Sequence, residues 1–257
     1  MEEAMRTVSV LTPVHKVTNA FLSDAYGSLV SQEMPVGWQW QWIVQEDGQS
    51  GEVAAVLPDD PRIITGTGRH GGPGVARTLA LSSATGELVK VLDADDRLTA
   101  GALRRDIEAF DRHPSVGWAT SAVLDILLDG ATLRFNADPP EGIIEKGEVF
   151  ERWVSNNYQA NIHPATLCIR RNLLLALGGW MALPASEDMG LLMALNVVSL
   201  GYFTAEPGLL YRKWPGQMTV QPSHRESVEQ SARHRIVEAR ARALLEMGVL
   251  VARNDAA

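Results

Sequence analysis

The first hundred residues alternate short apolar runs with segments of helical character. The apolar runs, rich in β-branched residues, cover positions 8–11, 40–44, 62–64 and 88–92. Segments with helical spacing, or opened by glycine and proline, lie between them at 21–30, 52–57 and 71–83. Strands separated by helices in this way form right-handed βαβ units. The sequence therefore predicts an α/β fold whose central sheet is mostly parallel and is flanked by helices.

Polar and acidic residues follow three of these four strands. They are His15, the pair Glu46 and Asp47, and the cluster Asp93, Asp95 and Asp96. Parallel sheets bind ligands at the carboxyl ends of their strands. Asp93 and Asp95 are two residues apart, so in an extended chain they point to the same side. They can hold a hard divalent cation together, or one can hold the metal while the other accepts a sugar hydroxyl. A plain turn or a helix N-cap remains the alternative.

Composition narrows the class of protein. The 257 residues suffice for one large α/β domain, and the net charge of −8 excludes the basic footprint of a nucleic-acid binder. The single cysteine, Cys168, excludes an internal disulfide framework and favours a reducing compartment. The acidic start of the chain does not read as a signal peptide, and the longest apolar stretch, 189–203, is too short to span a bilayer. We expect a cytoplasmic protein without a membrane span, in which residues 189–203 form a buried helix.

The second half of the chain has a less regular pattern. A helix is expected near 100–110 and a hairpin over 123–135, turning at Asp129 and Gly130. Strands are expected at 165–169 and 208–214, and a charged helix at about 223–247.

Five motifs follow one another along the chain. They lie at residues 8–14, 43–50, 76–78 with 84–87, 92–96, and 170–188. In this order and spacing they resemble family 2 glycosyltransferases of the GT-A fold, over roughly residues 7–220. The resemblance implies a Rossmann-like nucleotide-sugar-binding half at about 1–98, an acceptor and catalytic half at 99–220, and a helical extension at 221–257.

The resemblance also implies residues for the donor. Asp47 would accept a hydrogen bond from the nucleobase, and Arg77 and Pro13 would line the nucleotide pocket. Asp93 would contact the ribose or sugar, and Asp95 would ligate Mn²⁺ or Mg²⁺. Taken alone, Asp47 is equally well explained as a turn residue before Gly48, and Arg77 as a surface charge on a helix.

For catalysis, the resemblance implies that Asp188 is the general base of an inverting transfer, supported by Glu187. Trp180 would stack on an acceptor sugar ring. The competing interpretation makes Glu187 or Asp188 a cap of the following helix. A helix N-terminus lowers the pKa of a carboxylate, so we expect that effect to weaken Asp188 as a base and repulsion from Glu187 to oppose it.

Two positions depart from the family pattern. Thr78 stands where an asparagine is usual, and Trp214 stands where many members have a histidine that helps to bind metal. The metal would then rely on Asp95, the diphosphate and water. His70, His163 and His224 are alternative ligands, although a lone histidine is more often structural.

The expected function is transfer of a sugar from a UDP-, GDP- or dTDP-sugar to an acceptor hydroxyl on a soluble small molecule or glycan. Rival interpretations are a sugar nucleotidyltransferase and a non-catalytic scaffold that binds nucleotide sugars. The first is disfavoured because residues 12–16 contain no glycine-rich loop. Whether the protein forms a homodimer is left open.

Overall fold

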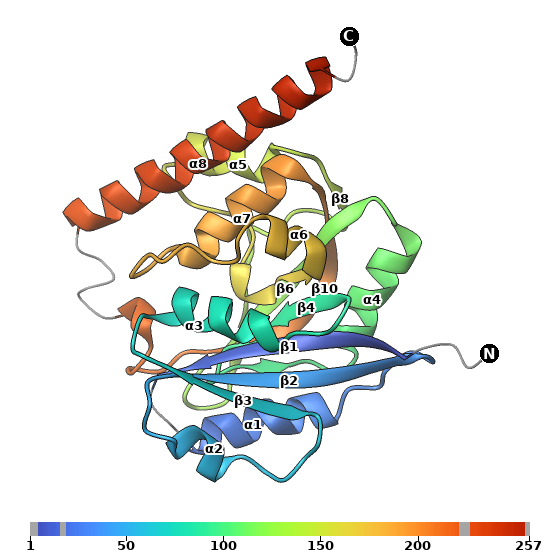
Figure 1. The fold of residues 1–257 in the computed structure, drawn as a ribbon, viewed down its shortest axis with the longest axis vertical. Coiled ribbons are helices and arrows are strands. Elements are labelled where there is room, and N and C mark those ends of the chain that lie inside the picture. The colour runs from blue at the N-terminus through green and yellow to red at the C-terminus, as the bar shows by residue number, and fades with distance from the viewer. Residues whose placement is uncertain (1–4, 16–18, 221–226, 255–257) are drawn as a thin grey trace.

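A computed structural model describes residues 5–15, 19–220 and 227–254, and it has the predicted α/β fold (Figure 1). One curled sheet of ten strands has the order β3-β2-β1-β4-β9-β6-β10-β5, with β7 paired to β6 and β8 paired to β10. The strands are β1 (Arg6–Val14), β2 (Trp38–Asp47), β3 (Ile63–Gly68), β4 (Leu88–Val91), β5 (Arg97–Leu98), β6 (Val116–Ile126), β7 (Thr132–Arg134), β8 (Gly142–Ile144), β9 (Cys168–Arg170) and β10 (Leu200–Arg212).

The first four strands in sequence form the parallel half of the sheet. β1 pairs in parallel with β2 and β4, and β2 pairs in parallel with β3. β9 then lies antiparallel between β4 and β6, while β6 and β10 run parallel to each other. The carboxyl ends of β1, β2 and β4 therefore meet at one edge, as the alternation of strands and helices predicted.

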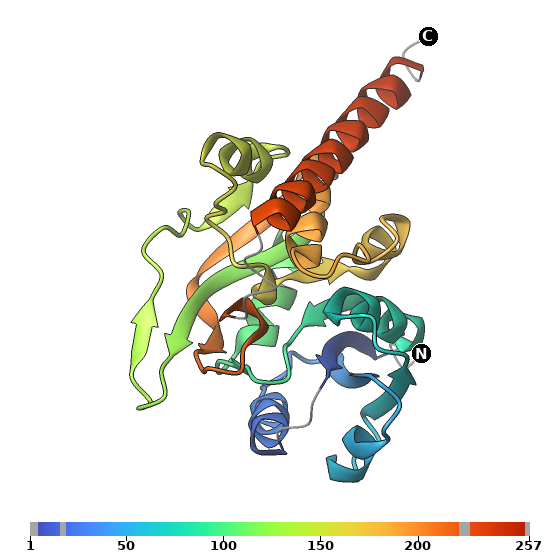
Figure 2. The same cartoon turned by 90° about the vertical axis from the view of Figure 1, so that its left-hand side faces the viewer.

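Helices cover both faces of the sheet (Figures 1 and 2). They are α1 (Asn19–Val30), α2 (Glu52–Val56), α3 (Pro73–Ala80), α4 (Ala102–Arg112), α5 (Glu148–Ser155), α6 (Arg171–Ala176), α7 (Glu187–Val198) and α8 (Ser227–Asn254), with short 3₁₀ turns at Leu81–Ser83, Pro164–Thr166 and Met218–Val220.

The alternation of side chains along each strand divides the core into two clusters. Val8 and Val10 of β1 pack with α1 and α4 on one face, whereas Leu11 packs with α3, α5 and α7 on the other. Six of the seven tryptophans are buried in these clusters, namely Trp38, Trp40, Trp42, Trp118, Trp153 and Trp180. The parallel sheet is thus covered on both sides, which is why its strands are so apolar.

The prediction of one buried helix over residues 189–203 was wrong at its end. Helix α7 stops at Val198, and β10 begins at Leu200 and ends at Arg212, within the separately predicted strand 208–214. Aromatic and β-branched residues such as Tyr202, Phe203 and Thr204 favour a strand, and apolarity alone does not distinguish a buried strand from a buried helix. Similarly, β6 begins at Val116, ahead of the hairpin expected from residue 123.

The C-terminal helix extends further than its charge pattern indicated. Helix α8 covers Ser227–Asn254, packs on α7 through Val237 and Ala241, and projects beyond the body of the protein (Figure 2). The other residues of the predicted extension, 221–226 and 255–257, lie outside the described residues. Within the described ranges, no helix has the length and apolarity that a membrane crossing requires.

Candidate active site

A cavity of about 560 Å³ opens at the carboxyl edge of the parallel strands. It gathers side chains from the ends of β1, β2 and β4, from α3 and from the start of α7. The predicted site residues that line it are Pro13, Asp47, Arg77, Asp93, Asp95, Glu187 and Asp188. Residues more than 170 positions apart in sequence thus meet in one cavity, because the start of α7 lies at the edge where β1, β2 and β4 end.

Asp47 is held at the rim of this cavity by the loop before α3. Its carboxylate is buried and accepts the backbone N–H of Gly71 at 2.7 Å and that of Gly72 at 3.0 Å. His70 places Nδ1 2.8 Å from Asp47 Oδ2. The carboxylate of the preceding residue, Glu46, stabilises the turn after β2 by accepting hydrogen bonds from Ser50 and from the amide of Gly51. These hydrogen bonds hold the pKa of Glu46 low.

Arg77 connects the end of β4 to the start of α7. Its buried guanidinium donates to Asp93 Oδ1 at 2.5 Å and to Glu187 Oε1 at 2.9 Å. Burial alone would lower the pKa of Arg77, but Asp93 and Glu187 more than offset that effect and raise it. Arg77 is therefore a permanent buried cation between two acidic segments, and not the surface charge of the competing interpretation.

Trp180 lies outside the cavity, contrary to the predicted stacking on an acceptor sugar. The ring is only 5% exposed, and its centroid lies 5.9 Å from the Arg77 guanidinium carbon. Its backbone N–H donates to the hydroxyl of Thr78 at 3.1 Å. Thr78, at the position where the family usually has asparagine, thus anchors the loop before α7, and the buried Trp180 ring has no free face for a sugar.

The first two residues of α7, Glu187 and Asp188, follow a turn residue with left-handed backbone conformation. Ser186 precedes the helix with φ of 65°, a left-handed conformation that costs a non-glycine residue about 1–2 kcal/mol. Asp188 Oδ1 accepts the N–H of Met189 at 2.6 Å. Helix α3 approaches this turn closely, because a Cβ on Gly74 would lie 2.7 Å from both Glu187 Cγ and the Met181 carbonyl oxygen.

Burial dominates the titration of this pair. It raises the pKa of Asp188, with Arg77 opposing the rise, and it raises the pKa of Glu187 to about 7, helped by repulsion from Asp188. The lowering effect expected from the helix N-terminus is therefore outweighed by burial, and the net shift of the Asp188 pKa is upward. A raised pKa brings a carboxylate closer to the working pH and makes it a stronger base.

Asp95 also lines the cavity, and its side chain contacts Trp214, which stands where many family members have a histidine. Asp95 Oδ2 accepts the indole N–H of Trp214 at 2.6 Å, and Arg212 donates to the Asp95 carbonyl oxygen. Burial raises the pKa of Asp95, with the Trp214 hydrogen bond opposing and Asp93 adding to the rise. Trp214 thus orients the carboxylate and offers no ligand of its own.

The described lining of the cavity carries an excess of negative charge. Its five carboxylates, Asp47, Asp93, Asp95, Glu187 and Asp188, face a single arginine, Arg77. An anionic diphosphate would be repelled by this lining unless a cation offset the charge. The oxygen ligands and the charge excess around Asp95 therefore fit Mg²⁺ or Mn²⁺.

The sequence named His163 only as an alternative metal ligand, and the structure places it in the lining of the cavity. The ring packs against Tyr211 with centroids 4.6 Å apart, and Nδ1 accepts the N–H of Ala165 at 3.4 Å. Burial, with Lys213 nearby, lowers the pKa of His163 to about 4, so the ring is neutral at physiological pH. The sequence signal is the His-Pro step that opens the 3₁₀ turn Pro164–Thr166.

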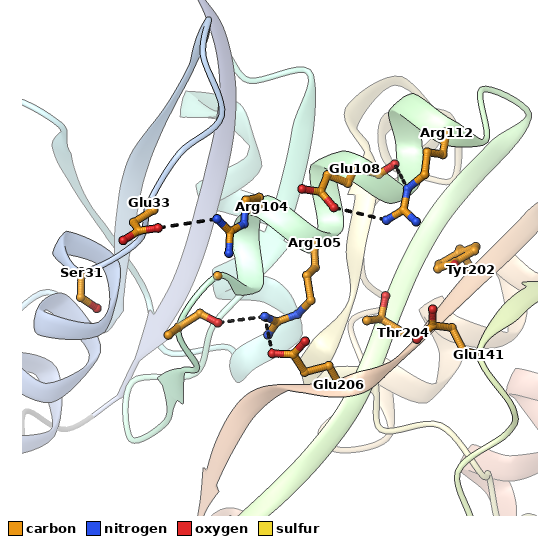
Figure 3. A pocket seen from close by; sticks show the side chains of 12 residues that line it. Ser31, Glu33, Arg104, Arg105, Glu108, Arg112, Glu141, Tyr202, Thr204 and Glu206 are labelled. Atoms are coloured by element: carbon orange, nitrogen blue, oxygen red, sulfur yellow. Dashed lines mark hydrogen bonds and ion pairs between the residues drawn. The ribbon is translucent and has the colours of Figure 1, made fainter.

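A second hollow of about 620 Å³, at α4 and β10, lacks comparable chemistry (Figure 3). Each of its arginines is paired with a glutamate: Arg104 with Glu33 at 3.6 Å, Arg105 with Glu206 at 2.8 Å, and Arg112 with Glu108 at 3.3 Å. Since these arginines are already paired and partly exposed, we place the active site in the acidic cavity.

Comparisons with known proteins identify the family of the chain. The family model described as glycosyl transferase family 2 matches residues 9–170, well over half of the chain. The chain belongs to glycosyl transferase family 2. It is a glycosyltransferase, and Asp47, Arg77, Asp93 and Asp95 lie inside the matched range, while Glu187 and Asp188 follow it.

Solved structures show the same GT-A fold. S. aureus TarS 1–349 in complex with UDP has a TM-score of 0.66 and 16% identity, covering 93% of this chain and 69% of that one. The complex of the same protein with UDP-GlcNAc has a TM-score of 0.66 and 18% identity, covering 93% and 70%. No curated protein sequence matches this glycosyltransferase significantly.

Proposed function

We propose that this family 2 glycosyltransferase moves a sugar from a nucleoside diphosphate sugar to an acceptor hydroxyl, with inversion and with help from Mn²⁺ or Mg²⁺. The observation that carries the proposal is the chain of contacts from Asp93 through Arg77 to Glu187, beside Asp95 and Asp188 in one cavity. TarS, which shares the fold, has been solved with UDP and UDP-GlcNAc, which favours a UDP-sugar among the candidate donors.

The donor is assigned to residues 1–98 and the acceptor to residues 99–220. Asp47 accepts from the nucleobase, Pro13 and Arg77 border the nucleotide, and Asp93 contacts the ribose or sugar. Asp95 holds the cation, which when bound supplies positive charge for the departing diphosphate. Through its two ion pairs, Arg77 holds the carboxylates of Asp93 and Glu187 in position during donor binding and transfer.

Asp188 is assigned to remove the acceptor proton. The acceptor oxygen attacks the anomeric carbon from the side opposite the diphosphate, so the configuration inverts as the bond to the phosphate oxygen breaks. Asp188 takes the hydroxyl proton, and its burial gives it the basicity for this step. Glu187, fixed by Arg77, adds negative charge beside it.

The donor site can be tested by thermal shift with UDP, GDP, dTDP and CDP, each with and without Mn²⁺. One diphosphate should stabilise the protein strongly only with metal, by about 2.7 kcal/mol at a hundred times its Kd. Asp95→Asn should abolish that shift, while Asp129→Asn, at an exposed turn, should retain it. If no diphosphate shifts the wild type, the donor site is misplaced.

The pH dependence of transfer should report the acidic pair. Because the pKa of Glu187 is raised to about 7 and that of Asp188 is also raised, the pair takes up a proton as the pH falls below about 7. The value of kcat/KM should then fall by about tenfold per pH unit. Glu187→Gln removes a neighbouring charge, so it should move this acid limb to lower pH. An unmoved limb would assign the titration to a group outside the pair.

A further inference from the structure

Two histidines that the proposed reaction does not use converge on Asp47. His70 Nδ1 lies 2.8 Å from Asp47 Oδ2, and His15 Nδ1 lies 4.0 Å from the same oxygen. One ligand atom from each of the three residues lies within 4.8 Å of the others. The two imidazole rings face each other with centroids 4.3 Å apart. His15 follows β1, Asp47 ends β2 and His70 follows β3, so the three adjacent parallel strands create this convergence.

The cluster combines a fixed carboxylate with accessible imidazoles. Asp47 is 4% exposed and is oriented by the Gly71 and Gly72 amides, the kind of outer hydrogen bonding that orients a metal ligand. The side chains of His15 and His70 are 52% and 65% exposed and border the cavity, so an ion and its water can reach them. Only small movements would bring the three atoms to metal-ligand spacing.

The ligand set differs chemically from that at Asp95. Carboxylate and water oxygens around Asp95 suit Mg²⁺ and Mn²⁺, whereas two imidazole nitrogens and one carboxylate oxygen suit Zn²⁺, Co²⁺ and Ni²⁺. His15 Nδ1 also lies 3.3 Å from the Asp47 carbonyl oxygen, and an ion bound through both Nδ1 atoms, with the ring protons on Nε2, would replace these contacts.

We propose that His15, Asp47 and His70 form a second cation site, selective for Zn²⁺-class transition metals, at the nucleobase end of the cavity. Three protein ligands leave the remaining positions to water. An ion there engages the carboxylate of Asp47, the group that the proposed function assigns to the nucleobase. Resting on that assignment, the consequence is competition: Zn²⁺ in this site weakens donor binding.

The site can be tested by Co²⁺ titration of the full chain after chelator treatment, followed by the visible absorption of bound Co²⁺. The wild type should bind one equivalent at this site, and His15→Gln and His70→Gln should each lower the affinity at least tenfold. His234→Gln, on α8, should match the wild type, and so should Asp95→Asn. The proposal is overturned if both His15→Gln and His70→Gln bind Co²⁺ as the wild type does, or if Asp95→Asn abolishes binding. Melting of the metal-free variants controls for folding.

Competition is measured separately, as the effect of Zn²⁺ on UDP affinity at saturating Mn²⁺. Zn²⁺ should weaken UDP binding to the wild type and leave the His70→Gln variant unaffected. Co²⁺ binding does not depend on the donor, so the two proposals can fail independently. Histidine-dependent Co²⁺ binding without any UDP binding would keep the metal site and reject the donor assignment, and Zn²⁺-insensitive UDP binding would reject the competition.

Discussion

Asp188→Asn should retain donor binding and lose sugar transfer by a factor of about 10²–10⁴, the usual contribution of a general base. The substitution keeps the shape of the side chain. Its amide oxygen can still accept the N–H of Met189, so the start of α7 should keep its conformation. What disappears is the capacity to take the acceptor's proton, because an amide is not a base at neutral pH.

Two measurements separate the roles of Asp188. The UDP affinity with Mn²⁺, from thermal shift, should match the wild type, and the single-turnover rate should show the loss. Asp129→Asn makes the same chemical change in an exposed turn, where the side chain only accepts the Ala131 amide, and its rate should be unchanged. A wild-type rate in Asp188→Asn would remove the base assignment and point to Glu187 as the next candidate.

The parallel half of the fold and the residues at its edge were predictable because they depend on local patterns. Runs such as 40–44 and 88–92 are apolar, β-branched and bounded by acidic residues, and a parallel sheet brings their ends together. This placed Asp47, Asp93 and Asp95 in one cavity without knowledge of any long-range contact.

The remaining features depend on tertiary contacts that no local pattern records. Residues 200–204 form part of β10 because they pair with β6, although they read as the end of an apolar helix. Trp180 was expected to stack on a sugar. In the structure its backbone N–H donates to the Thr78 hydroxyl, its ring lies near the Arg77 guanidinium, and the ring is buried. The sequence placed His15 at a strand end and named His70 as an alternative metal ligand, but their convergence on Asp47 depends on three adjacent strands and was not predicted. The pKa of Asp188 likewise follows from burial, which outweighs the helix terminus.

The second large effect is expected on stability, from Arg77→Met. Arg77 is the buried partner of both Asp93 and Glu187, and the structure gives these carboxylates no other buried cation among the contacts it describes. Removing one partner of a buried ion pair leaves uncompensated charge and typically costs about 3–5 kcal/mol. Methionine retains most of the aliphatic volume, so the loss should reflect charge more than packing.

The pH dependence of this loss identifies its cause. The pKa of Glu187 in the folded protein is raised from its ordinary 4.5 to about 7, so its contribution to stability is fully present below pH 4.5 and is lost as the pH rises through 7. Without Arg77, which lowers that pKa, the loss should continue above pH 7. In urea unfolding, the difference in the free energy of unfolding between the variant and the wild type should therefore be larger at pH 8 than at pH 5.

Arg112→Met is the matched control, because Arg112 forms an exposed i,i+4 pair with Glu108 at 3.3 Å. Pairs of this kind contribute about 0.3–0.5 kcal/mol, so the control should lose little stability at either pH. If Arg77→Met loses the same free energy of unfolding at pH 5 and at pH 8, the destabilisation comes from lost packing and not from unpaired charge. Arg77 would then contribute only packing, and burial alone would account for the raised pKa values of Glu187 and Asp188.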